Sequence, residues 1–158
     1  MAGKKEKMIS IQKSCEVLSS VDRVWEIVSD TGKDERYWTT LRDVKVLSNE
    51  GNRIEREANV GPRAFAHKSH QTLVLEPKQS IKLTMAGATM AGERNLVLVP
   101  LGKSNTRIDV SWLFEVKEVP GFVQGLVKGQ ISKATEEALK KIKEEAEHVI
   151  SARGGTVA

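Results

Sequence analysis

The chain of 158 residues is poor in several features that mark particular classes of protein. Its single cysteine, Cys15, excludes an internal disulfide and is typical of a buried thiol in a cytoplasmic protein. No apolar run approaches the roughly 18 residues that a membrane-spanning helix requires, and the charged N-terminus has no apolar signal core. We therefore expect a cytoplasmic protein without a transmembrane segment.

Sequence motifs of common catalytic and metal-binding sites are also missing. The chain has no P-loop, no G-x-G-x-x-G and no G-x-S-x-G pattern. His67 and His70 are separated by an odd interval, which on a strand places them on opposite faces. Cys15 and His148 offer no matching metal-ligand spacing. The sequence therefore predicts neither a metal site nor a cofactor.

The chain also lacks a large excess of charge of either sign. The net charge is +4, and basic and acidic residues are interleaved along most of the chain, so we do not expect nucleic acid as a partner. A hydrophobic content of 39% and a charged content of 29% are ordinary for a soluble globular protein of one domain. We expect that domain at residues 8–152, between flexible tails at 1–7 and 153–158.

The most regular pattern is a helical one, from Pro120 to about Ala152. Charged residues occupy one face, with Glu136 and Lys140 paired at i,i+4. A helix of roughly 30 residues spans about 45 Å, so it must lie across something wide. A coiled coil is the alternative, but the apolar stripe lacks a sustained heptad. That stripe comprises Val119, Phe122, Val123, Leu126, Val127, Ile131, Ala134, Ala138, Leu139, Ile142, Ala146 and Val149.

The rest of the chain indicates strands and two short helices. Residues 8–17 alternate between apolar and polar, as in a strand, and a helix capped by Ser19 or Ser20 follows to about Ser29. A second short helix, around Asp34 to Thr39, carries Tyr37 and Trp38. Six more strands, separated by turn residues, are expected at 43–48, 52–60, 64–76, 80–86, 90–99 and 106–116.

The short connections force neighbouring strands to run antiparallel. The sequence therefore predicts an α+β fold: a curved antiparallel sheet of about seven strands around a long C-terminal helix, with two short helices after the first strand. Such a sheet has one apolar face to bury, and the long helix is the element that covers it. A curved sheet that grips one helix can leave a pocket between the two.

Local motifs support this fold. The segment V-D-R-V-W-E-I-V-S-D at 21–30, followed by Trp38, is the most specific, and E-P-K-Q-S-I at 76–81 and L-V-P-L-G-K-S-N-T-R-I at 98–108 agree with it. In these features the chain resembles the START-like, or SRPBCC, superfamily of helix-grip proteins, especially its polyketide cyclase/dehydrase and lipid-transport branch. The usual proline before the first helix is missing here. The resemblance implies an internal cavity for a hydrophobic or amphipathic small molecule, without a fixed catalytic set.

Three polar side chains are expected to point into the sheet's concave face. Alternation places Arg56, His67 and Arg94 on the same faces as apolar neighbours. A buried arginine requires a carboxylate from the protein or from a ligand, although arginines near the sheet rim can instead reach water along their aliphatic stems. If the protein is an enzyme, His67 would act as acid or base, and Arg56 or Arg94 would stabilise developing negative charge.

The first functional hypothesis is therefore a non-catalytic binder or carrier of a hydrophobic or amphipathic molecule, such as a lipid, polyketide or quinone. The alternative is a cyclase-, dehydratase- or hydrolase-type enzyme that acts in the same cavity. We expect a monomer or weak homodimer and leave transient membrane contact open. The residues expected to line the cavity are Met85, Met90, Leu96, Trp112 and Phe114 from the sheet, with Phe122, Leu126 and Ile131 from the helix.

Three glycines at spacing four, Gly121, Gly125 and Gly129, occupy the first half of the long helix. Because they cost helix stability, we interpret them as thinning the helix where it passes the cavity. On this interpretation, replacing Gly125 by leucine should impair ligand uptake more than stability.

Overall fold

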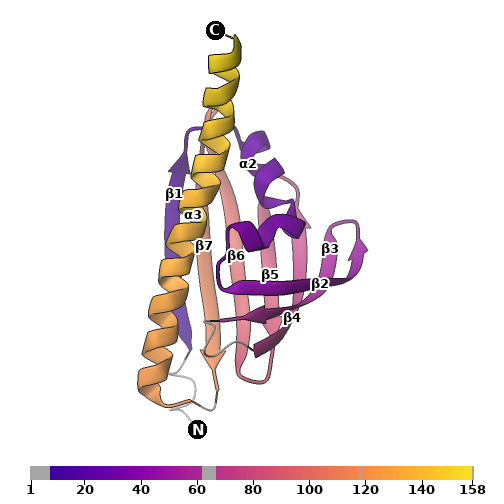
Figure 1. Cartoon of the computed structure of the whole chain (residues 1–158), viewed down its shortest axis with the longest axis vertical. Coiled ribbons are helices and arrows are strands. Elements are labelled where there is room, and N and C mark those ends of the chain that lie inside the picture. The colour runs from indigo at the N-terminus through magenta and orange to yellow at the C-terminus, as the bar shows by residue number, and fades with distance from the viewer. Residues whose placement is uncertain (1–7, 62–66, 118, 158) are drawn as a thin grey trace.

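The computed structural model describes residues 8–61, 67–117 and 119–157, and it shows a curved sheet with a long helix on its concave side (Figure 1). The elements are β1 (Ile9–Val17), α2 (Val21–Val28), the 3₁₀ helix η1 (Thr31–Arg36), β2 (Leu41–Glu50), β3 (Arg53–Val60), β4 (His67–Glu76), β5 (Ser80–Ala86), β6 (Met90–Gly102), β7 (Asn105–Val116) and α3 (Gly121–Val157). All seven strands belong to one antiparallel sheet in the order β1-β7-β6-β5-β4-β3-β2. The predicted helix-grip architecture is thus confirmed.

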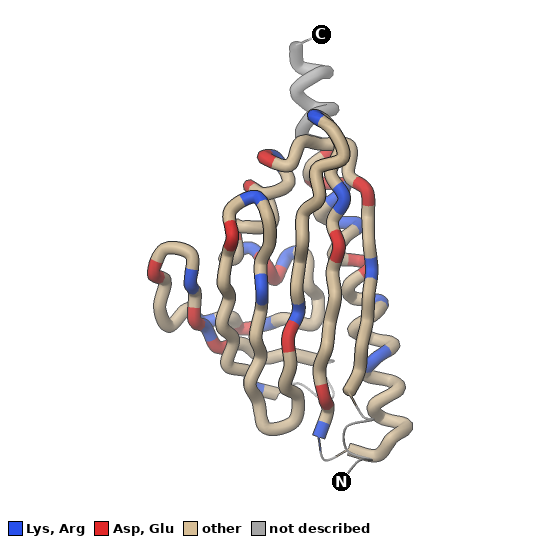
Figure 2. The backbone as a smooth tube through the Cα atoms, turned by 180° about the vertical axis from the view of Figure 1, so that it is seen from behind, with Lys and Arg blue, Asp and Glu red and all other residues tan. Residues whose placement is uncertain are grey.

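The strands form because polar and apolar residues alternate along them. In β7 the residues from Thr106 to Val116 alternate between buried and partly exposed, and the buried set faces α3 and α2. Seen from behind, Lys, Arg, Asp and Glu lie interspersed along the strands of the sheet (Figure 2). The sheet therefore has one side in the core and one side in water.

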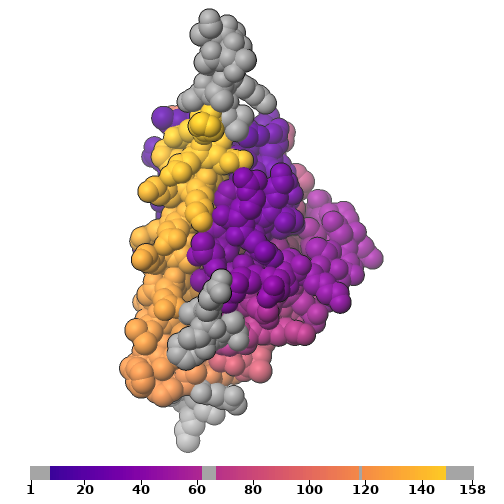
Figure 3. Space-filling model, in the orientation of Figure 1, coloured from indigo at the N-terminus to yellow at the C-terminus, as the bar shows by residue number. Residues whose placement is uncertain are grey.

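The two short helices after β1 cover the other part of the concave side. The cap of α2 is Ser20, whose Oγ accepts a hydrogen bond from the Arg23 backbone N–H at 3.2 Å. The second helix is displaced from its expected position: η1 ends at Arg36, and Tyr37 and Trp38 follow it, both buried. In space-filling view, the segment from α2 to β2 packs closely beside α3 (Figure 3).

Helix α3 is longer than expected, and the face that it turns to the sheet is narrower than the predicted apolar stripe. Val127 and Ile131 are buried, whereas Phe122 and Leu126 are 73% and 56% exposed. A Cβ atom added at Gly121, Gly125 or Gly129 would meet no neighbouring atom within 4 Å. The interpretation that these glycines thin the helix beside the cavity is therefore wrong. Each of these glycines stands two positions before a residue of the row Val123, Val127 and Ile131 that packs toward the core. At about 100° per residue, the glycines therefore face away from the core.

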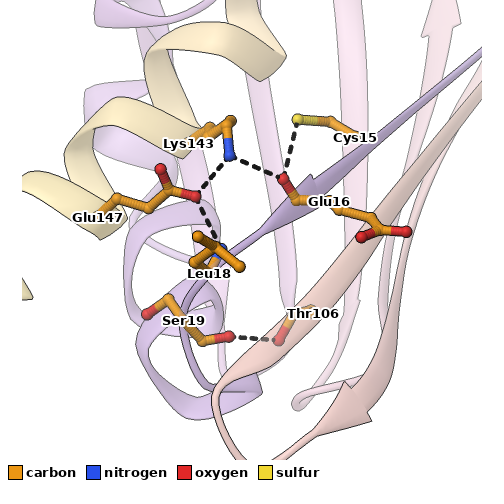
Figure 4. A network of polar contacts seen from close by, with 7 residues as sticks. All are labelled: Cys15, Glu16, Leu18, Ser19, Thr106, Lys143 and Glu147. Atoms are coloured by element: carbon orange, nitrogen blue, oxygen red, sulfur yellow. Dashed lines mark hydrogen bonds and ion pairs between the residues drawn. The ribbon is translucent and has the colours of Figure 1, made fainter.

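A polar cluster fastens α3 to the end of β1 (Figure 4). The Glu147 carboxylate accepts hydrogen bonds from the Leu18 backbone N–H at 2.7 Å and from the Lys143 ammonium at 2.6 Å. The same ammonium donates to the Glu16 carbonyl at 3.1 Å. Burial alone would raise the pKa of Glu147, but the two hydrogen bonds outweigh it and lower the pKa. Cys15, expected to be buried, is only half-buried beside this cluster.

Candidate functional site

A buried ion pair lies between η1 and the sheet. Arg56 of β3 is 1% exposed and shares its face with the buried Ile54 and Ala58, so alternation directs its side chain into the core. Its Nη1 donates to Asp34 Oδ2 at 3.0 Å, and its Nε donates to Gln71 Oε1 at 2.8 Å. Asp34 is itself buried on η1. The carboxylate that an inward arginine requires is therefore supplied, for Arg56, by the protein.

A second buried guanidinium belongs to Arg94 of β6, which is 4% exposed. Its Cζ lies 4.2 Å from the centroid of the Trp38 ring and 5.7 Å from that of Trp112. The two rings meet edge to face, with their centroids 6.2 Å apart. Trp112 is held in place because its Nε1 donates to Thr135 Oγ1 of α3 at 2.9 Å. Arg94 is thus packed against aromatic rings, which attract a cation through their negative faces.

These charges affect one another through the low-dielectric interior. Burial lowers the pKa of Arg94 to about 10, Asp34 opposes that change, and Arg56 adds to it. For Asp34, burial raises the pKa, and the two guanidinium groups act in the opposite direction. At neutral pH Arg94 is a cation, since a pKa of about 10 is well above 7, and the Arg56 guanidinium forms an ion pair with Asp34. The region therefore holds two positive charges for one carboxylate.

Several buried donors in this region have no hydrogen-bond partner among the described residues. They are Arg56 Nη2, Arg94 Nε and Ser69 Oγ. No side chain or carbonyl in that part of the chain accepts a hydrogen bond from any nitrogen of Arg94. Buried polar atoms are rarely left unpaired, and in a native structure each such atom needs an explanation.

A small cavity of about 20 Å³ lies beside the two arginines, between the sheet and α3. A second one of about 10 Å³ adjoins it and shares Trp38 and Arg94 with it. Each has room for roughly one water molecule. The residues that line the larger cavity are Trp38, Thr40, Leu41, Arg56, Val60, Gly61, Gln71, Leu83, Met85, Met90, Arg94, Trp112 and Ile131. The interior is therefore almost filled, and any larger ligand must displace side chains.

Most of the residues expected to bind a ligand are gathered here. Met85, Met90, Trp112 and Ile131 line the larger cavity, and Leu96 lines the smaller one. Phe114 is buried but lines neither; its ring packs edge to face on Trp112 at 6.0 Å. The placement of these residues agrees with the expectation, while their role in binding stays a prediction.

Two of the expected lining residues lie elsewhere. Phe122 and Leu126 are on the exposed face of α3 and line neither cavity, which corrects their assignment. The apolar stripe of the sequence is wider than the row that packs on the sheet, because Phe122 and Leu126 precede Val123 and Val127 by one position. One position is about 100° around a helix, enough to turn a side chain from core to water.

Of the three polar candidates, two line a cavity and one does not. The enzyme hypothesis requires at least two of these side chains to meet in one cavity, and Arg56 and Arg94 both line the larger cavity. His67 pairs with Val60 at the start of β4, is half-buried and lines neither cavity. Burial lowers the pKa of this histidine, which favours its neutral form.

Asp34 and Gln71 complete the cluster but were not identified as site residues from the sequence. Asp34 stands in the charged run G-K-D-E-R, where nothing distinguishes it from solvated neighbours. Gln71 shares a strand face with buried Leu73 and Leu75, so alternation marks it as inward-facing. The sequence points to Asp34 only indirectly, because an inward-facing Arg56 requires a carboxylate partner.

A wider groove on the surface has a different character. It encloses about 300 Å³ between the end of η1 and the later part of α3, and it is open to solvent. Its lining is mostly charged: Arg36, Tyr37, Lys141, Glu144, Glu145 and His148. Such a surface offers little apolar area for a hydrophobic ligand.

The described residues contain neither a group of His, Cys, Asp and Glu side chains arranged to hold a metal ion nor a helix apolar and long enough to cross a membrane. A family model for "Polyketide cyclase / dehydrase and lipid transport" matches residues 8–147. The chain therefore belongs to this family, as its resemblance in sequence predicted.

Solved structures agree on the fold. A START superfamily protein from Mycobacterium smegmatis is 20% identical, with 86% of this chain and 97% of that one covered and a TM-score of 0.70. A protein from Thermus thermophilus is 16% identical, with coverages of 89% and 99% and a TM-score of 0.76. The Zhui aromatase/cyclase from a Streptomyces species is 15% identical, with coverages of 90% and 87% and a TM-score of 0.63. The search of curated proteins found no match. At these identities the likeness concerns the fold alone, the START-like helix-grip fold.

Proposed function

We propose that the protein binds a hydrophobic or amphipathic small molecule between the sheet and α3. The observation that carries this proposal is the cavity walled by Met85, Met90, Trp38 and Trp112 inside the grip of the sheet. Aromatic and methionine side chains supply apolar contact, and methionine adapts to irregular shapes because its chain is flexible and polarizable. Membership of a family named for polyketide cyclases and lipid transport supports the same class of ligand.

Binding requires the interior to open, because the cavity is far smaller than the roughly 300–1,000 Å³ typical of sites for small organic ligands. The two methionines are the side chains that can move at least cost. They lie at the end of β5 and the start of β6, on either side of the turn that joins these strands. Rearrangement there would extend the cavity toward the end of the sheet.

The test is direct binding. Protein purified without organic solvent is examined by native mass spectrometry for a retained molecule, and its affinity for the neutral apolar probe N-phenyl-1-naphthylamine is measured by fluorescence titration. We expect saturable binding with one site. The variant Met90→Ala, which enlarges the cavity, should change the affinity by several-fold, whereas Met8→Ala, at an exposed methionine, should not. If the protein retains nothing and the probe does not bind, the proposed function is wrong.

The second candidate is a cyclase or dehydratase acting on such a ligand. It is favoured by the convergence of Arg56 and Arg94, since two guanidinium groups could stabilise an enolate oxygen as negative charge develops. Binding is preferred because the described lining of the larger cavity contains no histidine, carboxylate or tyrosine to move a proton. Incubation with a poly-β-ketone thioester mimic, followed by mass spectrometry, decides between them. Loss of water from the mimic would favour the enzyme.

A further inference from the structure

The charge balance of the interior points to the chemical class of the ligand. Arg56 and Arg94 place two cations in the core, and Asp34 is the one carboxylate recorded in contact with either of them among the described residues. That carboxylate pairs with Arg56 at 3.0 Å and influences Arg94 only at longer range. A buried charge without a counter-charge is costly, so an excess cation held in the core favours an anion that enters from outside.

The surroundings of Arg94 leave its hydrogen-bonding capacity unused. A guanidinium carries five N–H donors in a planar fork. The rings of Trp38 and Trp112 offset part of the cost of burying its charge, but they offer no oxygen acceptor for these N–H groups. In the described part of the chain, Nε has no acceptor and is fully buried. Arg94 lines the adjoining cavity, where an acceptor for these donors can lie.

The other polar atoms around the cavity are donors too. Arg56 lines it, and the Nη2 atom of Arg56 has no partner among the described residues. Gln71 also lines it; its Oε1 accepts a hydrogen bond from Arg56 Nε, while its amide NH₂ makes no hydrogen bond with the described residues. Three side chains from β3, β4 and β6 therefore present donors and positive charge to one small space.

We propose that this site takes the carboxylate of an amphipathic small molecule, held by Arg94 and Arg56, with the apolar body lying along Met85 and Met90. This rests on the proposed function and names the head group of its ligand. A carboxylate matches the planar fork of a guanidinium and neutralises the excess charge, which an alcohol or an ester cannot do.

The test compares each acid with its own ester by titration calorimetry at pH 7. The pairs are dodecanoate with methyl dodecanoate and 2-naphthoate with methyl 2-naphthoate. A hydrogen bond to a charged group contributes roughly 1.5–3 kcal/mol, so at least one acid should bind about tenfold to a hundredfold more tightly than its ester. The variant Arg94→Gln should remove this preference, so that the acid binds no more tightly than its ester. Arg107→Gln, at an exposed arginine on β7, is the matched control and should retain the preference.

The outcomes separate the two proposals. If wild-type protein binds acid and ester equally, or if Arg94→Gln keeps the preference for the acid, the carboxylate proposal is overturned while the proposed function stands. If neither member of any pair binds, and N-phenyl-1-naphthylamine also fails to bind, the proposed function itself is overturned. Circular dichroism establishes that Arg94→Gln is folded. Should it not fold, Arg94→Lys replaces it: this variant keeps the charge, loses the planar fork, and should reduce the preference for the acid several-fold.

Discussion

Removal of the buried carboxylate of Asp34 should be more damaging than removal of the arginine that it pairs with. The variant Asp34→Asn keeps the shape of the side chain but leaves Arg56 and Arg94 as two cations without a counter-charge. Breaking a buried ion pair from one side costs about 3–5 kcal/mol. The variant Arg56→Met leaves Asp34 facing Arg94, so one charge of each sign remains. Its cost should be about 1–3 kcal/mol, mainly the lost hydrogen bonds to Asp34 and Gln71.

Urea unfolding followed by circular dichroism measures both losses, and melting provides a second reading. For a chain of this size, 1 kcal/mol corresponds to roughly 2–4 °C, so Asp34→Asn should lower the Tm by about 6–20 °C. The control is Asp30→Asn, because Asp30 forms an exposed ion pair with Lys33 at 3.5 Å. Exposed pairs contribute about 0–1 kcal/mol. If Arg56→Met is as costly as Asp34→Asn, the core does not carry an excess of positive charge, and the reasoning fails.

Three further predictions concern α3. The pKa of Glu147 is lower in the folded protein than the unfolded value near 4.5. Its ionised form therefore contributes fully to stability above that value, and the contribution is lost as the pH falls through the pKa of the folded state. Glu147→Gln should reduce the free energy of unfolding at pH 7, and the difference from wild type should vanish in acid. Thr135→Val removes the acceptor of the Trp112 indole N–H and should cost about 1–3 kcal/mol in urea unfolding, with Thr135→Ser as the neutral control. Gly125→Ala should raise stability by about 0.5–1 kcal/mol and leave probe affinity unchanged, since the position is exposed with open space around it; reduced probe binding would contradict this placement.

The strands were predictable because each carries a signal that depends only on nearby residues. In β7 the alternation from Thr106 to Val116 fixes both the element and its buried face, and short turns then fix antiparallel order. The same alternation correctly placed Arg56 and Arg94 in the core. The fold could thus be derived from the chain alone, whereas alternation only favoured an inward position for the two arginines and left a position at the sheet rim open.

The rest depends on distances that a linear pattern does not contain. Which face of α3 meets the sheet is a matter of rotation, and an apolar stripe that includes both Leu126 and Val127 is too wide to decide it. The pairing of Asp34 with Arg56 joins η1 to β3 across 22 residues of sequence, and no local feature marks it. The cavity volume depends on how closely the side chains pack, which composition cannot give.

The contact between Trp38, Trp112 and Arg94 has a practical consequence for studying this protein. Two of its three tryptophans lie at the cavity, both near Arg94, and the third, Trp25, is on α2 and lines neither cavity. Indole emission changes with local polarity and with nearby charge, so filling the cavity or removing the cation alters the signal of two fluorophores against one steady background. The fluorescence of Trp38 and Trp112 can therefore report on the proposed binding of a ligand in unlabelled protein.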